Sequence, residues 1–488
     1  MEQLNGRKMI LTTEKEINSS NVVAVLNQAL LVHWVNREQI IYLWKYYRGN
    51  QPILNRVKEV RPEICNHIVE NRAYEIVDFQ SGYFLGEPLQ YVSKGTESDD
   101  TEKLNTLNSY LDIQNKSAKD KELSDYSHIF GTAYRIILPN EYIDEEDIAP
   151  FEIFNLYTPN AFVIYSNGLG NKPLMGVYYV TDEYGVPTYS CYTKNEYFEI
   201  TLDKVIKHGY HILNDIPIVE YPLNIARMGA FELVISLLDA INLTDSNRLD
   251  GVEQFIQALM LFHNVDIVEE DFKKLHDLGA LKFKDIDPTM KGEVEYLLNN
   301  LNQAETQVLT DHMYNVVLTI CGMPNRNGGS STSDTGAAVV YRDGWSAAET
   351  RARDKELIFK KAERKTLKII LKICRILEDL DLKLKDIEIR FTRRNYENIL
   401  MKAQVLDLML NNPKIDPQLA FTHSGMFVDA ELAYKKSMEY YEKFKKEQQE
   451  LMMRNGGNND PRTNTRNDSA NRKSTETREQ SRVADRTG

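Results

Sequence analysis

The sequence predicts an α+β protein of several domains, in which a β-rich unit lies between long helical segments. Three observations support this fold class. The chain of 488 residues is longer than one hydrophobic core usually serves. Apolar residues alternate with polar ones through residues 132–222, which is the period of strands. Before and after this stretch they recur at the period of about 3.6 residues that amphipathic helices require.

Composition narrows the possible functions. A hydrophobic share of 42% and an aromatic share of 10% are those of a globular protein. The net charge of −13 argues against a protein that wraps nucleic acid in a basic surface, because neutralising phosphates requires clustered Lys and Arg. It does not exclude a protein past which DNA slides. The four cysteines include no CxxC pair and are expected to be reduced, buried thiols.

No membrane or export signal is expected. The N-terminal residues are charged and polar, without the apolar core of a signal peptide. No stretch of the chain approaches the run of about 18 apolar residues that would predict a membrane span.

The N-terminal part is predicted to be helical. Helical periodicity covers residues 22–60, RPEI at 61–64 interrupts it, and a second helical pattern covers 66–85. Gly86 and Pro88 then break the helical pattern ahead of an expected strand. The polar residues 94–121 predict a loop followed by a short helix.

The β-rich part predicts seven strands joined by short turns, as in an antiparallel meander. Turns such as NGLGNKP and DEYGVP separate neighbouring strands. The expected strands are TAYRIIL (132–138), FEIFNLY (151–157), AFVIY (161–165), LMGVYYVT (174–181), PTYSCYT (187–193), EYFEIT (196–201) and IPIVEYP (216–222).

Helical periodicity returns after residue 222. A small insert of mixed character (263–294) separates the first two helices, and an isolated strand (387–391) follows the third. Residues after 454 have almost no apolar side chains, so burial cannot offset the entropy of ordering and we expect disorder. The five helices are expected at residues 230–262, 302–320, 347–377, 398–410 and 429–453.

The third of these helices is basic, against the sign of the whole chain. Residues 347–375 contain ten Lys or Arg and four Asp or Glu. A basic helix face can contact DNA, but most charged faces are simply solvated. The pattern alone leaves both interpretations open.

A loop rich in Gly and hydroxyl groups, NRNGGSSTSDTGAAVVYRDGW (325–345), lies between the second and third helices. Phosphate-binding loops begin in a similar way, but they require GxxxxGK[ST] after a strand. This loop contains no Lys and follows a helix, so it does not fit a nucleotide site. The sequence itself leaves open whether it is a linker or a working loop.

Metal and catalytic motifs are weak. HGYH (208–211) has the spacing of a loose metal pair but no third ligand nearby, and is expected to be a surface or half-buried pair. The acidic runs EYIDEED (141–147) and DLDLKLKD (379–386) lack the pattern of a calcium loop. No GxSxG or HExxH occurs. We therefore expect no metal, no cofactor, no catalytic residue and no enzymatic activity.

Several segments, taken in order, resemble the portal protein family of tailed bacteriophages, in the type found in phages of Gram-positive bacteria. The resemblance extends over residues 41–453, and its order and spacing carry more weight than any single motif. The matching segments are IYLWKYYRGNQPIL, NRAYEIVDFQSGYFLGEPLQY, FGTAYRIIL, IPIVEYPLN and FELVISLLDAINLTDSNRLDGVEQFIQALM.

The resemblance implies a multi-domain portal-type subunit with a β-rich wing, a helical stem, a small α/β clip and a helical crown, assembling into a ring. The implied parts are an N-terminal arm (1–20), the wing (21–229), a stem helix (230–262), the clip (263–301), a second stem helix (302–321), the tunnel-loop region (322–346), a long helix returning to the wing (347–377), a wing strand (378–395), crown helices (396–453) and a disordered tail (454–488).

In this family the loop after the second stem helix projects into the axial channel and is called the tunnel loop. Glycine mobility and small neutral hydroxyl groups suit a loop that touches a moving duplex without gripping it. The residues implied to face DNA are Asn325, Asn327, Gly328, Gly329, Ser330, Ser331, Thr332, Ser333, Asp334 and Thr335.

Two groups of basic residues are further candidates. Arg351, Arg353 and Lys355 follow the loop and are expected either to offset phosphate repulsion in the channel or to form salt bridges between subunits. The lysines of the clip are expected to bind its partner proteins; they are Lys273, Lys274, Lys282 and Lys284.

The resemblance also implies partners and a location. The chain would form a ring of about twelve copies at one capsid vertex, with closed symmetry. Double-stranded DNA would pass through this ring during packaging and ejection. The expected partners are the terminase large subunit, the head-tail connector proteins, the scaffold and the major capsid protein, first in the host cytoplasm and then in the virion, with no membrane.

Two alternatives remain at this point. The sequence patterns are also compatible with another structural head protein, such as a minor capsid or head-completion component. A nucleotide-dependent packaging enzyme would need a Lys in the Gly-rich loop and an acidic metal ligand after a strand, and the sequence offers neither.

Overall fold

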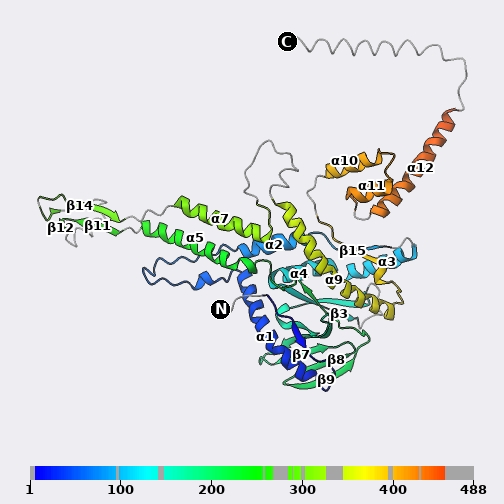
Figure 1. The fold of residues 1–488 in the computed structure, drawn as a ribbon, viewed down its shortest axis with the longest axis horizontal. Helices are drawn as coiled ribbons and strands as arrows, with labels where there is room; N and C mark the ends of the chain where they lie inside the picture. Colours follow the sequence, from blue (N-terminus) through cyan, green and yellow to red (C-terminus); the bar gives the residue numbers. More distant parts are fainter. Residues whose placement is uncertain are drawn as a thin grey trace, which may run out of the picture. The chain divides into compact units, whose positions relative to one another are not determined.

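The computed structural model describes residues 6–94, 98–140, 148–256, 259–266, 284–287, 289–297, 303–325, 344–393, 399–427 and 430–456. It divides into two compact units, Met1–Tyr396 and Glu397–Gly488. The first unit contains both helices and β-sheets, which confirms the predicted α+β class (Figure 1).

The N-terminal helices match the helical periodicity only in part, because the stretches expected at 22–60 and 66–85 are both shorter in the structure: the first helix ends at Tyr47 and the second begins at Arg72. They are α1 (Val22–Tyr47), the 3-10 turn η1 (Pro52–Asn55), α2 (Arg72–Phe84), α3 (Ser98–Ile113) and α4 (Lys116–Phe130). The loop expected from residue 94 is thus far shorter, because α3 begins at residue 98. Leu104, Leu107 and Leu111 of α3 are buried at helical spacing, so three apolar residues outweigh an otherwise polar segment.

The predicted strands form two sheets and not one meander. The larger sheet has the order β1-β5-β6-β7-β8-β9, in which β1 is parallel to β5 and the others are antiparallel. Its strands are β1 (Ile10–Thr12), β5 (Ala161–Ser166), β6 (Pro173–Thr181), β7 (Pro187–Tyr192), β8 (Glu196–Thr201) and β9 (Lys204–Tyr210).

The second sheet is antiparallel, with the order β10-β3-β4. Its strands are β3 (Thr132–Pro139), β4 (Phe151–Leu156) and β10 (Ile218–Pro222). Strands β1 and β9 were not expected. β1 has only three residues, too few for its alternation to predict a strand, and nearly every residue of β9 is exposed, so β9 shows no burial alternation.

A hairpin of two helices follows β10. The 3-10 turn η3 (Glu232–Val234) leads into α5 (Ile235–Ile256), which packs against α7 (Gln303–Cys321). Between them lie two small antiparallel sheets, β11 (Leu259–His263) with β14 (Glu293–Leu297) and β12 (Val265–Asp266) with β13 (Lys284–Asp285).

The first hairpin helix is therefore shorter than the expected 230–262. The run LMLFH (259–263) is a strand, which periodicity cannot distinguish from a helix end in so short an apolar segment.

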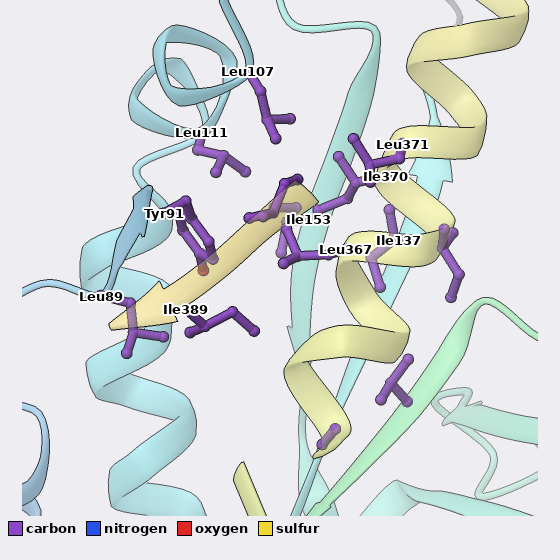
Figure 2. Close-up of a cluster of buried hydrophobic side chains, with 14 of the residues drawn as sticks. Leu89, Tyr91, Leu107, Leu111, Ile137, Ile153, Leu367, Ile370, Leu371 and Ile389 are labelled. Carbon is purple, nitrogen blue, oxygen red and sulfur yellow. The ribbon is translucent and has the colours of Figure 1, made fainter. Parts of the chain in front are cut away.

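Helix α9 (Trp345–Leu377) returns from the hairpin to the sheets. It packs on β10 and β3, and its apolar side joins the largest core of the unit. After the 3-10 turn η4 (Leu384–Asp386), strand β15 (Ile387–Arg390) pairs with β2 (Gln90–Ser93). Figure 2 shows this core, to which β2, α3, β3, β4, α9 and β15 all contribute.

The second unit contains α10 (Ile399–Leu410), α11 (Pro417–Ser424) and α12 (Ala430–Gly456). Two of these helices were expected and α11 was not, because NPKIDP suggests only a break. Asp416 caps α11 by accepting from the amide of Gln418 over 2.7 Å, and Phe421 of α11 packs on Tyr434 of α12.

Candidate functional site

The predicted loop leaves and re-enters the first unit at one place. The described chain stops at Asn325 after α7 and resumes at Gly344 before α9. A Cβ atom on Gly344 would lie 3.8 Å from the Cα of Pro324, so the two ends are neighbours. Gly344 has φ of +85°, which favours glycine.

Most of the expected tunnel loop lies outside the described residues. Asn325 is described, and its Nδ2 donates to Oδ1 of Asn315 over 3.0 Å. Asn327 and residues 328–335 are not described, so their contact with DNA stays a prediction.

Side chains from two other helices cap the C-terminal carbonyl groups of α7. Arg351 of α9 donates to the carbonyl oxygens of Ile320 and, over 3.3 Å, of Thr319. Gln80 of α2 donates to the carbonyl oxygen of Cys321 over 2.8 Å. The last carbonyl groups of a helix lack partners within it, and a cation suits this negative end. Arg351 therefore ties the start of α9 to the end of α7.

The other two basic candidates of α9 have different surroundings. Arg353 is exposed, at 72% of its side chain, and pairs with Glu349 over 2.8 Å. Lys355 points inward: its Nζ donates to Oε1 of Gln80 over 2.7 Å and lies 3.3 Å from Nε2 of His128. Within the single chain, Arg351 and Arg353 are both exposed, but Arg351 is held against the end of α7 by its hydrogen bonds. Whether any of them faces a channel or a neighbouring subunit stays a prediction.

Lys355 gives this junction a pH dependence. Burial lowers the pKa of Lys355 to about 7, and the nearby Arg351 adds to this while Cys321 opposes it. Burial also lowers the pKa of its neighbour His128 well below the ordinary value, with Lys355 and Lys121 contributing. A lysine in the unfolded chain has a pKa of about 10.4. Between the folded-state pKa and this value, the unfolded chain therefore binds more protons than the folded chain. The free energy of unfolding should then rise with pH from about 7 to about 10.

We expect Lys355→Met to remove this slope, by up to about 1 kcal/mol per pH unit. The measurement is urea unfolding of the wild type and the variant at several pH values between neutral and mildly alkaline. Lys361→Met, at an exposed position of the same helix, is the control. An equal pH dependence in wild type and Lys355→Met would contradict the assignment.

A polar cavity of about 600 Å³ opens beside the loop base. Residues of α2, α5 and α7 line it, together with Glu70, Met323, Pro324 and Asn325. Five carboxylates and two guanidinium groups make it acidic overall; they are Glu70, Glu75, Asp78, Asp245, Asp311, Arg72 and Arg248. Arg72 stacks on Tyr314 at 4.0 Å and pairs with Glu75 at 2.8 Å, so the cavity wall is well ordered by internal contacts.

A buried ionic cluster anchors α9 in the sheets. Glu363 of α9 contacts Lys116 of α4 at 3.0 Å, and Arg135 of β3 contacts Asp120 of α4 at 2.6 Å. Tyr91 of β2 also donates to Glu363, over 2.8 Å. Burial alone would raise the pKa of Glu363, but Lys116 and Arg135 outweigh it and hold the pKa below the ordinary value. Sequence reasoning missed this cluster, although a Glu within the apolar stripe of α9 was a usable signal.

The remaining predicted residues have no assigned role in the described structure. Lys273, Lys274 and Lys282 lie outside the described residues, and Lys284 is described only as part of strand β13. In HGYH, His208 stacks on Phe198 with ring centroids 4.7 Å apart, and Nε2 of His211 lies 3.0 Å from the carbonyl oxygen of Thr193.

No group of three or more His, Cys, Asp or Glu side chains in the described ranges is placed to hold a metal ion. None of the described helices is both long and apolar enough to cross a membrane.

The model of one protein family, described as phage portal protein, SPP1 Gp6-like, matches residues 30–452. No curated protein sequence matches the chain. Among solved structures, a chain from "Neck of empty GTA particle computed with C6 symmetry" has 10% sequence identity and a TM-score of 0.42; the match covers 72% of this chain and 90% of that one.

The family match covers most of the chain and places it among the structural proteins of phage particles. The chain belongs to the phage portal protein family, SPP1 Gp6-like, and its function is that of a portal protein at the capsid vertex. The resemblance found in the sequence is thereby confirmed, and the match favours neither alternative function.

Proposed function

We propose that the chain is the subunit of a ring of about twelve copies through which double-stranded DNA enters and leaves the capsid. This proposal rests on the helical hairpin of α5 and α7. The start of α5 and the end of α7 join the rest of the first unit, and the described chain stops at residue 325 and resumes at residue 344 beside this junction. The hairpin would be the stem, the small sheets β11 to β14 part of the clip, and the sheets with α1 to α4 the wing. Helices α10 to α12 would form the crown.

In this proposal the loop residues 325–335 line the constriction of the channel. The segment consists of Gly, Ser, Thr and Asn apart from Arg326 and Asp334, whose charges cancel, so it can donate hydrogen bonds to phosphates without a strong electrostatic grip. The capping of α7 by Arg351 and Gln80 would give this loop a fixed base. Arg353, exposed on α9, is the basic candidate best placed to meet phosphate or a neighbouring subunit.

The chain would act through position and charge and not as an enzyme. The clip would dock the terminase large subunit during packaging and the head-tail connector proteins afterwards. The scaffold and the major capsid protein would contact the ring during assembly in the host cytoplasm. The crown and its C-terminal tail would face the capsid interior.

A knock-out of this gene tests the proposal. Phage lacking the protein should yield heads without DNA, and wild-type protein supplied in trans should restore DNA-filled heads. The measurement is nuclease-protected DNA per head. Filled heads in the complete absence of the protein would contradict a role as the DNA conduit.

A further inference from the structure

The segment that leads from strand β15 towards the second unit lies along helix α9. Strand β15 and α9 belong to the same core (Figure 2). Phe391, the residue after β15, packs on Phe359 of α9, with the two ring centroids 5.8 Å apart. Two residues later, Arg393 pairs with Glu356 and Glu349, which are nearer to the start of α9. The segment therefore runs towards the N-terminal end of α9, where the described chain resumes.

Arg393 joins two carboxylates of α9. Its Nη1 donates to Oε1 of Glu349 over 2.8 Å, and its Nη2 donates to Oε2 of Glu356 over 2.6 Å. The two glutamates are seven residues apart, so they lie about two turns from each other on one side of the helix. Only 9% of the Arg393 side chain is exposed. This side chain therefore clamps the segment against the first turns of α9.

Glu349 also connects to the place where the chain re-enters the first unit. Its Oε2 accepts from the hydroxyl of Tyr83 of α2 over 2.9 Å. The ring of Tyr83 lies 6.0 Å from that of Trp345, the first residue of α9, and Phe79 of α2 packs on the same indole at 6.0 Å. A series of direct contacts thus extends from Arg393 through Glu349 and Tyr83 to the indole.

The clamp can open without leaving a carboxylate unpaired. Glu349 also pairs with Arg353 at 2.8 Å, and Glu356 also pairs with Lys360 at 2.5 Å, each four residues further along α9. Opening a partly buried ion pair is most costly when it leaves a charge uncompensated, and these local partners prevent that. Nε of Arg393 has no hydrogen-bond partner among the described residues, so its bonding capacity is not fully used. The arrangement suits a contact that both holds and releases.

We propose that Arg393 is a positioning residue, which reversibly links the chain leading to the second unit with the base of residues 326–343. While Arg393 is seated on its two carboxylates, the first turns of α9 and the indole of Trp345 are held in place. A displacement of the chain beyond Arg393 removes this hold. Such coupling is reciprocal, so a change at the start of α9 also alters how firmly Arg393 is held. The effect of the link on DNA rests on the proposed function, whereas the link itself does not.

Fluorescence of Trp345 tests the link. Trp34→Phe with Trp44→Phe makes it the sole tryptophan of the full-length chain. Arg393→Gln in this parent should raise the acrylamide quenching constant by about twofold, because local opening exposes the indole more often. Arg375→Gln, which removes an exposed ion pair at the other end of α9, is the matched control and should leave the constant unchanged. An equal constant in Arg393→Gln and its parent would overturn the proposal.

Salt and a double-mutant cycle distinguish a reversible link from a general loss of stability. In the parent, about 1 M salt screens charges beyond about 3 Å and should itself raise the quenching constant, whereas Arg393→Gln should change little further. The double variant Glu349→Gln, Arg393→Gln should be quenched much less than the sum of the two single changes, because both remove one shared contact. Additive changes, or an undiminished salt response in Arg393→Gln, would overturn the proposal.

Packaging tests the consequence for DNA. Arg393→Gln should form normal rings, and nuclease-protected DNA per head should fall by about fivefold or more relative to Arg375→Gln, which is the lower end of typical coupling between sites. Unchanged DNA per head together with raised quenching would overturn the part of the proposal that concerns the loop. Absence of rings or of packaged DNA in the wild type would instead remove the proposed function, and the fluorescence result would still stand.

Discussion

Replacing Glu363 with glutamine is expected to lower the free energy of unfolding of the first unit by about 3 kcal/mol or more, because a buried ion pair that loses one partner leaves an uncompensated charge. Glu363 is fully buried and accepts hydrogen bonds from Tyr91 and Tyr221, each over 2.8 Å. Its loss would leave Lys116 and Arg135 with one remaining carboxylate, that of Asp120.

The measurement is chemical unfolding followed by a spectroscopic probe of the first unit. Glu378→Gln, at the exposed end of α9, is the control and should change stability little. A Glu363→Gln variant as stable as the wild type would show that the cluster does not anchor α9.

The same cluster should make the unit sensitive to acid. The folded-state pKa of Glu363 lies below its ordinary value, so its contribution to stability is present above the pKa of an unfolded glutamate, about 4.3. This contribution is lost as the pH falls below that value. Glu363→Gln should therefore unfold with a weaker pH dependence than the wild type in the acidic range.

Deletion of residues 328–335 is expected to leave rings intact and to reduce packaged or retained DNA severely. The two ends of the loop are neighbours in the described structure, so a shorter connection can close without moving α7 or α9. The channel constriction, if built from these residues, would disappear. The measurement is nuclease-protected DNA per head together with the oligomeric state of the purified variant.

A length-matched deletion of residues 481–488 serves as the control for the loop deletion. It removes polar residues at the C-terminus and should leave packaging unchanged. If the loop variant forms rings and packages and retains DNA as the wild type does, the role assigned to the loop is wrong. If it forms no rings, the loop instead contributes to assembly, which also contradicts the prediction.

Local patterns allowed much of the fold to be predicted. The 3.6-residue stripe Phe359, Ala362, Thr366 and Ile370 identified α9, and all four residues are buried. Strands β3 to β8 and β10 followed from alternation. What local patterns could not show was which strands share a sheet: β2 and β15 pair although about 300 residues separate them, and that pairing depends on a core assembled from the whole unit.

The candidate site was predictable only in outline. The loop could be located by its composition and its place between two helices. The contacts that define its base could not, because the partners of Arg351 and Lys355 come from α2, α4 and α7. Likewise, Asn242, Ser246 and Asp250 lie four residues apart on α5 and accept from backbone amides within residues 66–70. The sequence alone does not show that this segment runs alongside the helix.

The central claim is that this chain builds a closed ring with an axial opening. Electron microscopy of the purified full-length protein tests it most directly. We expect end views of a ring with a central hole, with about twelve subunits in the class averages, and side views with a narrow stem. Monomers at high protein concentration, flat lattices or filled particles without a hole would contradict the account.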